Sequence, residues 1–378
     1  MRVYVDIAHP AHAHALRFFI GEMKARGHEI LVSARDKDIT HNLLTAWDIP
    51  FINRGKGHLV DGRPRSAFSP SGKTASGRVV KSSGPVTWFR GIVSLSGKFI
   101  YLLRVTVRLF PVVRKFRPDL VISYSSYHAA LAGRLLGRPV ITFEDTENVP
   151  LLHLLNRFLS SRMVTPLCFE KDLGRKHIRF NGYKELASLH PARFRPLPLP
   201  GDFRVPYIVM RLVSWRAWHD RGHTGISDRM KIAVARRLSA HGRVFISSEV
   251  PLEGPLRKYE MNIDSNLAHS VLAGARLFFG ESASMAAEAA VLGVPAFYID
   301  NTGRGYTRDL EREHGLLFNF GEDDAAVQLA LDTAVGLLQK PDLQKEWQQK
   351  RTRMLEGKTD VTAMMVEMAE KLTAGDKR

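Results

Sequence analysis

Small and hydroxyl-bearing residues form a turn between a predicted strand and an alanine-rich helix at residues 280–290, which read GESASMAAEAA. Such a turn places backbone N–H groups and the positive end of the helix at the carboxyl edge of a parallel sheet, an arrangement that binds phosphate. Ser282 and Ser284 can add hydroxyl donors, and Glu288, further along the helix, can accept hydrogen bonds from a ribose diol. The alternative is structural: Ser282 only caps the helix, and the alanines only allow close packing.

Three histidines, His9, His12 and His14, follow the first predicted strand. An imidazole with an ordinary pKa near ~6.5 can take a proton from a hydroxyl group at neutral pH, so these histidines are candidate bases. A metal site would need further ligands beside these histidines. Asp6 is the one carboxylate nearby in the sequence and does not complete such a site, so we predict no metal. A structural role in capping the helix is the other alternative.

Acidic residues follow the predicted strand at residues 139–143, where the sequence reads FEDTE. Open α/β sheets place their ligand-binding groups after the carboxyl ends of the strands. Glu144 and Asp145 should therefore lie at the same edge as the histidines, and they are alternative catalytic bases.

Positive charge is concentrated in one part of the chain. The 378 residues include 55 Lys and Arg against 38 Asp and Glu, a net charge of +17. Residues 54–117 hold 14 of these basic residues and one acidic residue, Asp61. Such a block favours an anionic partner, either nucleic acid, an acidic membrane surface or a phosphate-rich substrate, and a solvated loop without a partner is the alternative.

Within this block, glycine, serine and proline predict a flexible insertion at about 55–96, followed by a helix that ends near residue 117. Aromatic groups beside cations suit a segment that lies at a membrane surface. The alternative is a core helix whose basic face meets water. The residues expected to contact an acceptor or a membrane are Trp88, Phe89, Arg90, Arg104 and Arg108.

Strands and helices alternate on both sides of this block, which predicts parallel sheets covered by helices. The length suggests two domains, and five prolines between residues 191 and 206 mark the predicted boundary. We predict an N-terminal domain over 1–195, a C-terminal domain over 205–355 and a further helix within 356–378.

The single cysteine, Cys168, excludes a disulfide framework and a multi-cysteine zinc site, and it fits a reducing compartment. The first residues lack the pattern of a secretory signal, and no window has the ~18 apolar residues of a membrane-spanning helix. We therefore expect a cytoplasmic protein, either free or bound peripherally to the inner face of the membrane.

The stretch from Gly280 to Pro295, GESASMAAEAAVLGVP, resembles the nucleotide-binding signature of GT-B-fold glycosyltransferases, such as the MurG-like enzymes, and of UDP-N-acetylglucosamine 2-epimerases. Together with DIAHPAHAH, FEDTE, RFNGYKEL, FISSE and GRGYT, it makes the chain similar to the DUF354 family of predicted glycosyltransferases. The resemblance implies an α/β, GT-B-like fold, with two Rossmann-like domains whose parallel sheets face each other across a cleft. The domain over 1–195 would bind the acceptor, the domain over 205–355 would bind the nucleotide sugar, and the helix within 356–378 would pack back on the N-terminal domain. The resemblance also implies transfer of a sugar from a nucleotide-diphosphate donor, with UDP the expected nucleotide, to a lipid-linked or cell-surface glycan acceptor, without a separate cofactor.

Applied to this sequence, the resemblance implies that the turn after residue 279 holds the diphosphate and ribose, and that Arg304 supplies a cation for the departing diphosphate. Glu281 departs from the pattern, because it places an acid beside the expected phosphate, where it must point away or hydrogen-bond the sugar. The expected catalytic residues are His12, Glu144 and Asp145. The residues expected to bind the nucleotide sugar are Arg211, Ser214, Ser247, Ser248, Glu249, Gly280, Ser282, Ser284, Glu288, Arg304 and Gly305.

Two other functions stay open. An epimerase would act on the nucleotide sugar itself, with carboxylates such as Glu144, Asp145 and Glu147 and a histidine such as His219, and it would need no acceptor. A non-catalytic protein would bind RNA or DNA through the basic block. Aromatic residues are sparse in that block and no nucleic-acid-binding module is recognisable, so we expect no specific nucleic-acid partner.

Overall fold

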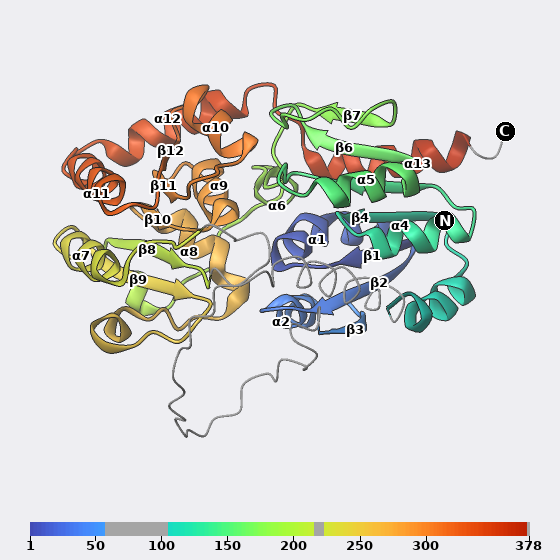
Figure 1. The fold of residues 1–378 in the computed structure, drawn as a ribbon, viewed down its shortest axis with the longest axis horizontal. Coiled ribbons are helices and arrows are strands. Elements are labelled where there is room, and N and C mark those ends of the chain that lie inside the picture. The colour runs from blue at the N-terminus through green and yellow to red at the C-terminus, as the bar shows by residue number, and fades with distance from the viewer. Residues whose placement is uncertain (57–104, 215–222, 376–378) are drawn as a thin grey trace, which may run out of the picture.

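The first of two parallel sheets belongs to the N-terminal part of the chain. A computed structural model describes residues 1–56, 105–214 and 223–375 (Figure 1). The first sheet has seven strands in the order β3-β2-β1-β4-β5-β6-β7, and every neighbouring pair is parallel. Its strands are β1 (Arg2–Ile7), β2 (Glu29–Asp36), β3 (Ile52–Lys56), β4 (Leu120–Tyr124), β5 (Val140–Phe143), β6 (Arg162–Pro166) and β7 (His177–Phe180).

The second sheet follows the proline-rich stretch. It has five strands in the order β12-β11-β10-β8-β9, again all parallel. The two sheets confirm the predicted architecture of two parallel-sheet α/β domains. The strands are β8 (Tyr207–Leu212), β9 (Arg243–Ser248), β10 (Phe278–Gly280), β11 (Ala296–Ile299) and β12 (Leu317–Phe320).

Helices connect most of the consecutive strands within each sheet, as is usual for parallel pairs, while β6 and β7 are joined by turns alone. The first sheet carries α1 (Pro10–Ala25), α2 (Thr40–Ala46), a helix at 105–116, α4 (Tyr127–Leu135), α5 (Pro150–Leu159) and α6 (Leu186–Leu189). The second part of the chain contains α7 (Asp228–Leu238), α8 (Ala268–Gly274), α9 (Ala283–Val291), α10 (Gly305–Arg312), α11 (Asp324–Leu338), α12 (Leu343–Leu355) and α13 (Val361–Gly375), with 3-10 turns η1 (Gly201–Phe203), η3 (Gly254–Tyr259) and η4 (Ser265–Leu267).

Helix α13 returns from the C-terminal part of the chain to the first domain, where it packs against α1 and α6 (Figure 1). Its buried apolar side chains are Val361, Met365, Val366 and Ala369. Arg193 fixes the start of this helix, because its Nε lies 2.7 Å from Asp360 Oδ1 while its Nη1 pairs with Glu22 of α1. The first domain is therefore assembled from both ends of the described chain.

Both sheets have a point at which the order of strands reverses, and such points are where open α/β sheets bind ligands. In the first sheet the reversal lies between β1 and β4, and in the second it lies between β8 and β10. The predicted GESAS turn directly follows β10, and the histidine turn directly follows β1. The topology thus places both sequence motifs at switch points.

Local structure differs from the sequence-based expectation in a few places. Helix α1 begins at Pro10 and is capped by His9, whose Nδ1 accepts the Ala11 N–H at 3.2 Å. Strand β3 continues through Lys56, so the first two residues of the predicted insertion belong to the sheet.

The described residues contain no helix that is both long and apolar enough to cross a lipid bilayer.

Candidate active site

At the turn after β10, the backbone lies very close to the backbone of the neighbouring strand β8. A Cβ atom on Gly280 would lie 2.3 Å from the carbonyl oxygen of Arg211 in the neighbouring strand, so only glycine fits. Ser282 caps α9, because its side chain accepts the Met285 N–H at 3.4 Å, and Ser284 lies in the first turn of the helix. The expected helix end with small side chains is therefore present, and Ser282 also has the structural role that was the alternative.

Glu281 points away from the helix end. Its carboxylate accepts the backbone N–H groups of Val213 at 2.8 Å and of Ile226 at 2.7 Å. The side chain is 3% exposed. Glu281 thus stabilises the connection between β8 and α7, which leaves the N-terminus of α9 without an acidic side chain directed at it from this position.

A polar network joins the carboxyl ends of β8 and β9. The Arg211 guanidinium donates to Ser247 Oγ at 2.8 Å and to Glu249 Oε1 at 2.9 Å. The second Glu249 oxygen accepts from the backbone and hydroxyl of Ser214 at 3.2 and 3.1 Å. Ser248 instead accepts the Val250 N–H at 3.2 Å and supports the local turn. Four of the predicted nucleotide-binding residues therefore lie together at one sheet edge.

Glu288 faces a histidine pair that crosses the domain boundary. Its Oε1 lies 3.4 Å from His269 Nε2, and the ring centroids of His269 and His14 are 4.1 Å apart. His14 belongs to α1 and His269 to α8, so the pair brings the two domains into contact. Burial, followed by repulsion from His269, lowers the pKa of His14 well below its ordinary value, so this imidazole is neutral at pH 7.

His12 differs from its expected electrostatic state. The imidazole is enclosed and stacks on Tyr124 with ring centroids 5.4 Å apart. Burial, reinforced by the Lys184 ammonium, lowers its pKa to about 3. The expectation of an ordinary pKa near ~6.5 was wrong, because the sequence does not show that this turn is buried. Nδ1 of His12 is buried and has no hydrogen-bond partner within the described structure.

Glu144 has the electrostatic properties of a base that works near neutrality. The side chain is 1% exposed. Ser125 Oγ donates to its Oε2, and its Oε1 accepts the N–H groups of Asp145 and Thr146 at 3.1 and 3.2 Å. Burial, followed by repulsion from Asp145, raises the pKa of Glu144 to about 7 in spite of these hydrogen bonds.

Asp145 forms a buried ion pair with Lys184, which comes from the segment after β7. Burial alone would raise the pKa of Asp145, but the Lys184 ammonium lowers it below its ordinary value. Glu185 Oε1 also lies 3.5 Å from Lys184 Nζ. Burial is the largest influence on Glu185 and raises its pKa to about 7. Lys184 and Glu185 were missed as site residues, although they lie in the RFNGYKEL motif.

The carboxyl edges of the two sheets meet through Glu147 and Gly305. Glu147 follows β5, and its Oε1 accepts the Gly305 N–H at 3.2 Å at the start of α10. A Cβ atom on Gly305 would lie 2.4 Å from both this carboxylate and the Cys168 carbonyl oxygen, so glycine permits the contact. Arg308 in the same helix makes a bidentate pair with Glu170, with both bonds at 2.8 Å. These contacts hold α10 against the first domain.

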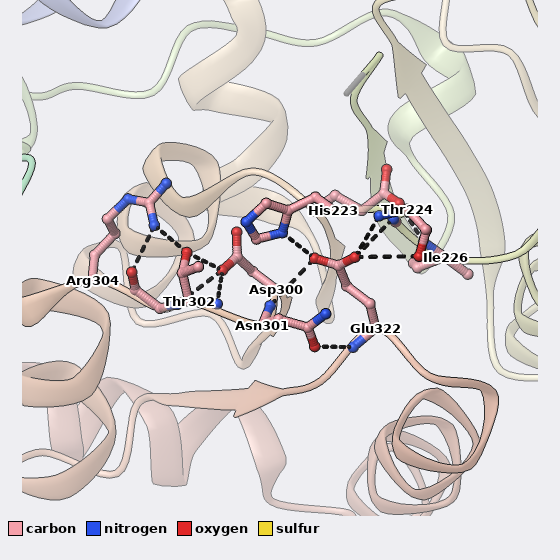
Figure 2. A network of polar contacts seen from close by, with 11 residues as sticks. His223, Thr224, Ile226, Asp300, Asn301, Thr302, Arg304 and Glu322 are labelled. Carbon is pink, nitrogen blue, oxygen red and sulfur yellow. Dashed lines mark hydrogen bonds and ion pairs between the residues drawn. The ribbon is translucent and has the colours of Figure 1, made fainter. Parts of the chain in front are cut away.

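Figure 2 shows a second network beyond the end of β11. Arg304 donates to Thr302 Oγ1 at 2.8 Å and to the Gly303 carbonyl at 2.6 Å. Asp300 accepts from the Thr302 backbone, and Glu322 pairs with His223. Arg304 therefore lies at the predicted edge and is held by its own loop.

His223, Asp300 and Glu322 offer ligand atoms that all lie within 4.8 Å of one another, the spacing of a metal site. Their oxygens already accept hydrogen bonds from backbone N–H groups. Glu322 Oε2 accepts from Thr224 and Gly225 at 2.8 and 2.9 Å. Asp300 Oδ1 accepts from Thr302 and Gly303 at 2.5 and 2.8 Å. Backbone N–H donors already occupy these oxygen lone pairs. The carboxylates of Asp300 and Glu322 are therefore better suited to holding the surrounding loops in place than to binding a cation.

Several of the predicted site residues lie in parts of the chain that the structure does not describe. Trp88, Phe89, Arg90, Arg104 and His219 lie outside the described residues. Arg108 is described, and its side chain is exposed on the helix at 105–116. The membrane-contact prediction can therefore be examined only through Arg108 and its surroundings.

Comparison with known proteins supports the fold. No protein-family model matches the sequence, and no curated protein matches it. Among solved structures, the chain is similar to UDP-GlcNAc 2-epimerase from Neisseria meningitidis bound to UDP-GlcNAc, with a TM-score of 0.62, 13% identity, and 98% of this chain and 100% of that chain covered. It is also similar to the spinosyn forosaminyltransferase SpnP, with a TM-score of 0.64, 16% identity and 99% of both chains covered.

A third similar structure is the glycosyltransferase VinC in complex with DTDP, with a TM-score of 0.63, 13% identity, and 98% of this chain and 99% of that chain covered. These structures cover nearly the whole chain and include both glycosyltransferases and epimerases. The chain therefore has the two-domain Rossmann-like fold of GT-B glycosyltransferases and UDP-GlcNAc 2-epimerases. At these identities the similarity extends to the fold alone.

Proposed function

We propose that this protein is a glycosyltransferase that moves a sugar from a nucleotide-diphosphate donor, with UDP the proposed nucleotide, to an acceptor hydroxyl group. One observation carries the proposal. The small-residue turn at the N-terminus of α9 lies at the switch point of the second sheet, while a buried acid–base cluster, Glu144, Asp145 and Lys184, lies after strands of the first sheet. Similar folds bind UDP-GlcNAc and DTDP.

The donor would bind at the edge of the second sheet. The N-terminus of α9 is positive and suits the diphosphate, and Ser284 in its first turn can donate a hydroxyl group. Arg211 would add a cation at the end of β8, where Ser247 and Glu249 fix the guanidinium. Glu288 would accept from the ribose diol and exchange its contact with His269 for that interaction.

The acceptor would be activated from the first sheet. Glu144 is our preferred base among the three predicted catalytic residues, because a base works best when its pKa is near the operating pH. Glu144 would take the proton of the acceptor hydroxyl, whose oxygen forms a bond to the anomeric carbon. The bond from that carbon to the diphosphate breaks, and Arg304 would stabilise the departing anion. Asp145, in its ion pair with Lys184, is a weaker base.

We propose an anionic, lipid-linked or cell-surface glycan acceptor reached from the inner face of the membrane. Its support is the charge distribution, because residues 54–117 carry 14 basic residues and one acidic residue. A phosphate-bearing acceptor would be attracted to this part of the first domain. The DUF354 resemblance is consistent with this proposal.

Isothermal calorimetry with UDP, GDP and DTDP tests the donor site. Glu288→Ala should weaken the best of these ligands by about tenfold or more, because a hydrogen bond to a charged group contributes about 1.5–3 kcal/mol. Glu367→Ala, which changes an exposed carboxylate on α13, is the matched control and should bind as the wild type does. Unchanged affinity in Glu288→Ala would contradict the site assignment.

A UDP-GlcNAc 2-epimerase activity is the second candidate, because four buried carboxylates, Glu144, Asp145, Glu147 and Glu185, lie near the domain junction. An epimerase removes and returns a proton at one carbon, which needs acid and base groups but no acceptor. NMR of UDP-GlcNAc incubated with the protein alone separates the two reactions. Inversion at C2 without an acceptor would overturn the transferase proposal.

A further inference from the structure

Helix α5 turns its polar face toward the protein interior and exposes an apolar face to solvent. Its two buried residues, His153 and Asn156, are polar. Leu151, Leu154 and Phe158 point outward and are 48%, 50% and 71% exposed. Their i, i+3, i+7 spacing places them on one face of the helix. A helix at a water-exposed surface ordinarily has the opposite arrangement, so this face of α5 is suited to an apolar partner.

The neighbouring helices extend this surface. Val113 of the helix at 105–116, Ala129 and Ala132 of α4, and Leu159 of α5 pack in one hydrophobic cluster, so the three helices lie side by side on the same face of the sheet. Exposed apolar side chains continue on the other two helices at Val107 and Leu135. We call the outward surface of these three helices the α4–α5 face.

Exposed charge on the α4–α5 face and in the adjoining segments of residues 105–162 has one sign. Residues 105–162 are described throughout, and all eight of their Lys and Arg side chains are exposed. The same range contains four acidic residues: three of them, Glu144, Asp145 and Glu147, are buried, and Asp119 is half-buried. The exposed cations are Arg108, Arg114, Lys115, Arg117, Arg134, Arg138, Arg157 and Arg162.

We propose that the α4–α5 face docks on an anionic lipid membrane. Cations would contact the lipid phosphates while Leu151, Leu154 and Phe158 enter the boundary between headgroups and acyl chains. Nucleic acid would match the charge but offers no hydrocarbon for the leucines, and a second copy of the chain would bring two basic faces together. Residues 57–104 carry the same sign of charge, with eight basic residues and one acidic residue.

Vesicle co-sedimentation of the full chain tests the proposal. Vesicles of phosphatidylcholine with phosphatidylglycerol should bind the wild type, and vesicles of phosphatidylcholine alone should bind it much more weakly. Phe158→Ser should weaken binding to the anionic vesicles by about tenfold, because it removes the aromatic side chain that would be inserted into the lipid. Arg134→Glu with Arg138→Glu should also weaken it, and about 0.5 M NaCl should reduce the wild-type binding.

Matched controls lie in the other domain. Leu329→Ser changes a leucine of α11 that is 60% exposed, and Arg353→Glu changes an exposed arginine of α12. Both should bind vesicles as the wild type does. The proposal is overturned if anionic vesicles are not bound, or if the controls lose as much binding as Phe158→Ser.

Two further outcomes would assign the face to another partner and would also overturn the proposal. One is a dimer in light scattering that Phe158→Ser dissociates. The other is binding to a DNA duplex that the arginine substitutions abolish and Phe158→Ser leaves intact, without vesicle binding. The vesicle assay contains no nucleotide sugar, so its result is independent of the proposed sugar transfer. If the protein binds vesicles but transfers no sugar from any donor, this inference stands and the proposed function is wrong.

Discussion

Glu144 should make the protein less stable as the pH rises from about 4.5 to 7, and replacing it with glutamine should remove this loss. The carboxyl group is 1% exposed, and burial raises its pKa from 4.5 to about 7. The folded state therefore keeps a proton that the unfolded chain has already released in this pH range. Since stability falls with pH wherever the folded state binds more protons, the loss is complete above pH 7.

The size of this effect follows from the shift in pKa. A change of one unit corresponds to 1.36 kcal/mol, so a rise from 4.5 to about 7 corresponds to about 3 kcal/mol. Glu144→Gln keeps the shape of the side chain and has no proton to release. The variant should gain up to about 3 kcal/mol over the wild type at pH 8 and little at pH 4.5, while losing turnover if Glu144 is the base.

Urea denaturation followed by circular dichroism at several pH values between 4.5 and 8 measures both curves. Glu367→Gln on α13 is the control, because this carboxylate is exposed and should leave the pH dependence as in the wild type. Parallel curves for Glu144→Gln and the wild type would refute the reasoning. A variant that is more stable at pH 8 yet fully active would keep the electrostatic argument and remove Glu144 as the base.

Two other substitutions probe groups that the fold holds in place. Lys184→Met removes the ammonium paired with Asp145 and should cost about 3–5 kcal/mol of unfolding free energy at pH 8. The loss should shrink toward pH 5 as the unpaired carboxyl groups take up protons, whereas the exposed Lys371→Met should change stability by less than about 1 kcal/mol in urea denaturation. Glu281→Ala leaves two backbone N–H groups without their acceptor, so it should cost about 1–3 kcal/mol and weaken nucleotide affinity in calorimetry. A Glu281→Ala protein as stable as the wild type would show that water replaces the carboxylate there.

The sequence was sufficient for the architecture and for the edge of each sheet that holds the candidate site. Alternating strands and helices imply parallel sheets. Parallel strands bring the residues after β1 and β5 to one edge of the first sheet, and those after β8 and β10 to one edge of the second sheet. The motifs are therefore sufficient to place His12, Glu144, Arg211 and the turn at Gly280 at these edges. Their positions follow from chain direction alone.

The burial of the site residues and the ion pairs between them could not be predicted from the sequence in the same way. The pKa of His12 depends on its burial, where Tyr124 of β4 stacks on the ring, and on the ammonium of Lys184. Both residues are far from His12 in the sequence. Lys184 follows the edge strand β7, and nothing in its spacing shows that it will meet Asp145. The signal available was a Lys-Glu pair before the apolar run LASL, since charges beside buried residues are usually paired. Which face of α5 is buried depends likewise on its neighbours in space, because its amphipathic pattern alone would predict that the leucine-rich face is buried, whereas the structure buries His153 and Asn156.

The position of α13 determines the order in which the chain can fold during synthesis. A ribosome must complete the whole second sheet before it makes the helix that covers α1 and α6. Until then, the first domain exposes the apolar surface that Met365, Val366 and Ala369 later bury. Nascent chains of this protein should therefore require protection by chaperones until translation passes α13. A premature stop codon before Val361 would leave both sheets encoded but the first domain without this cover.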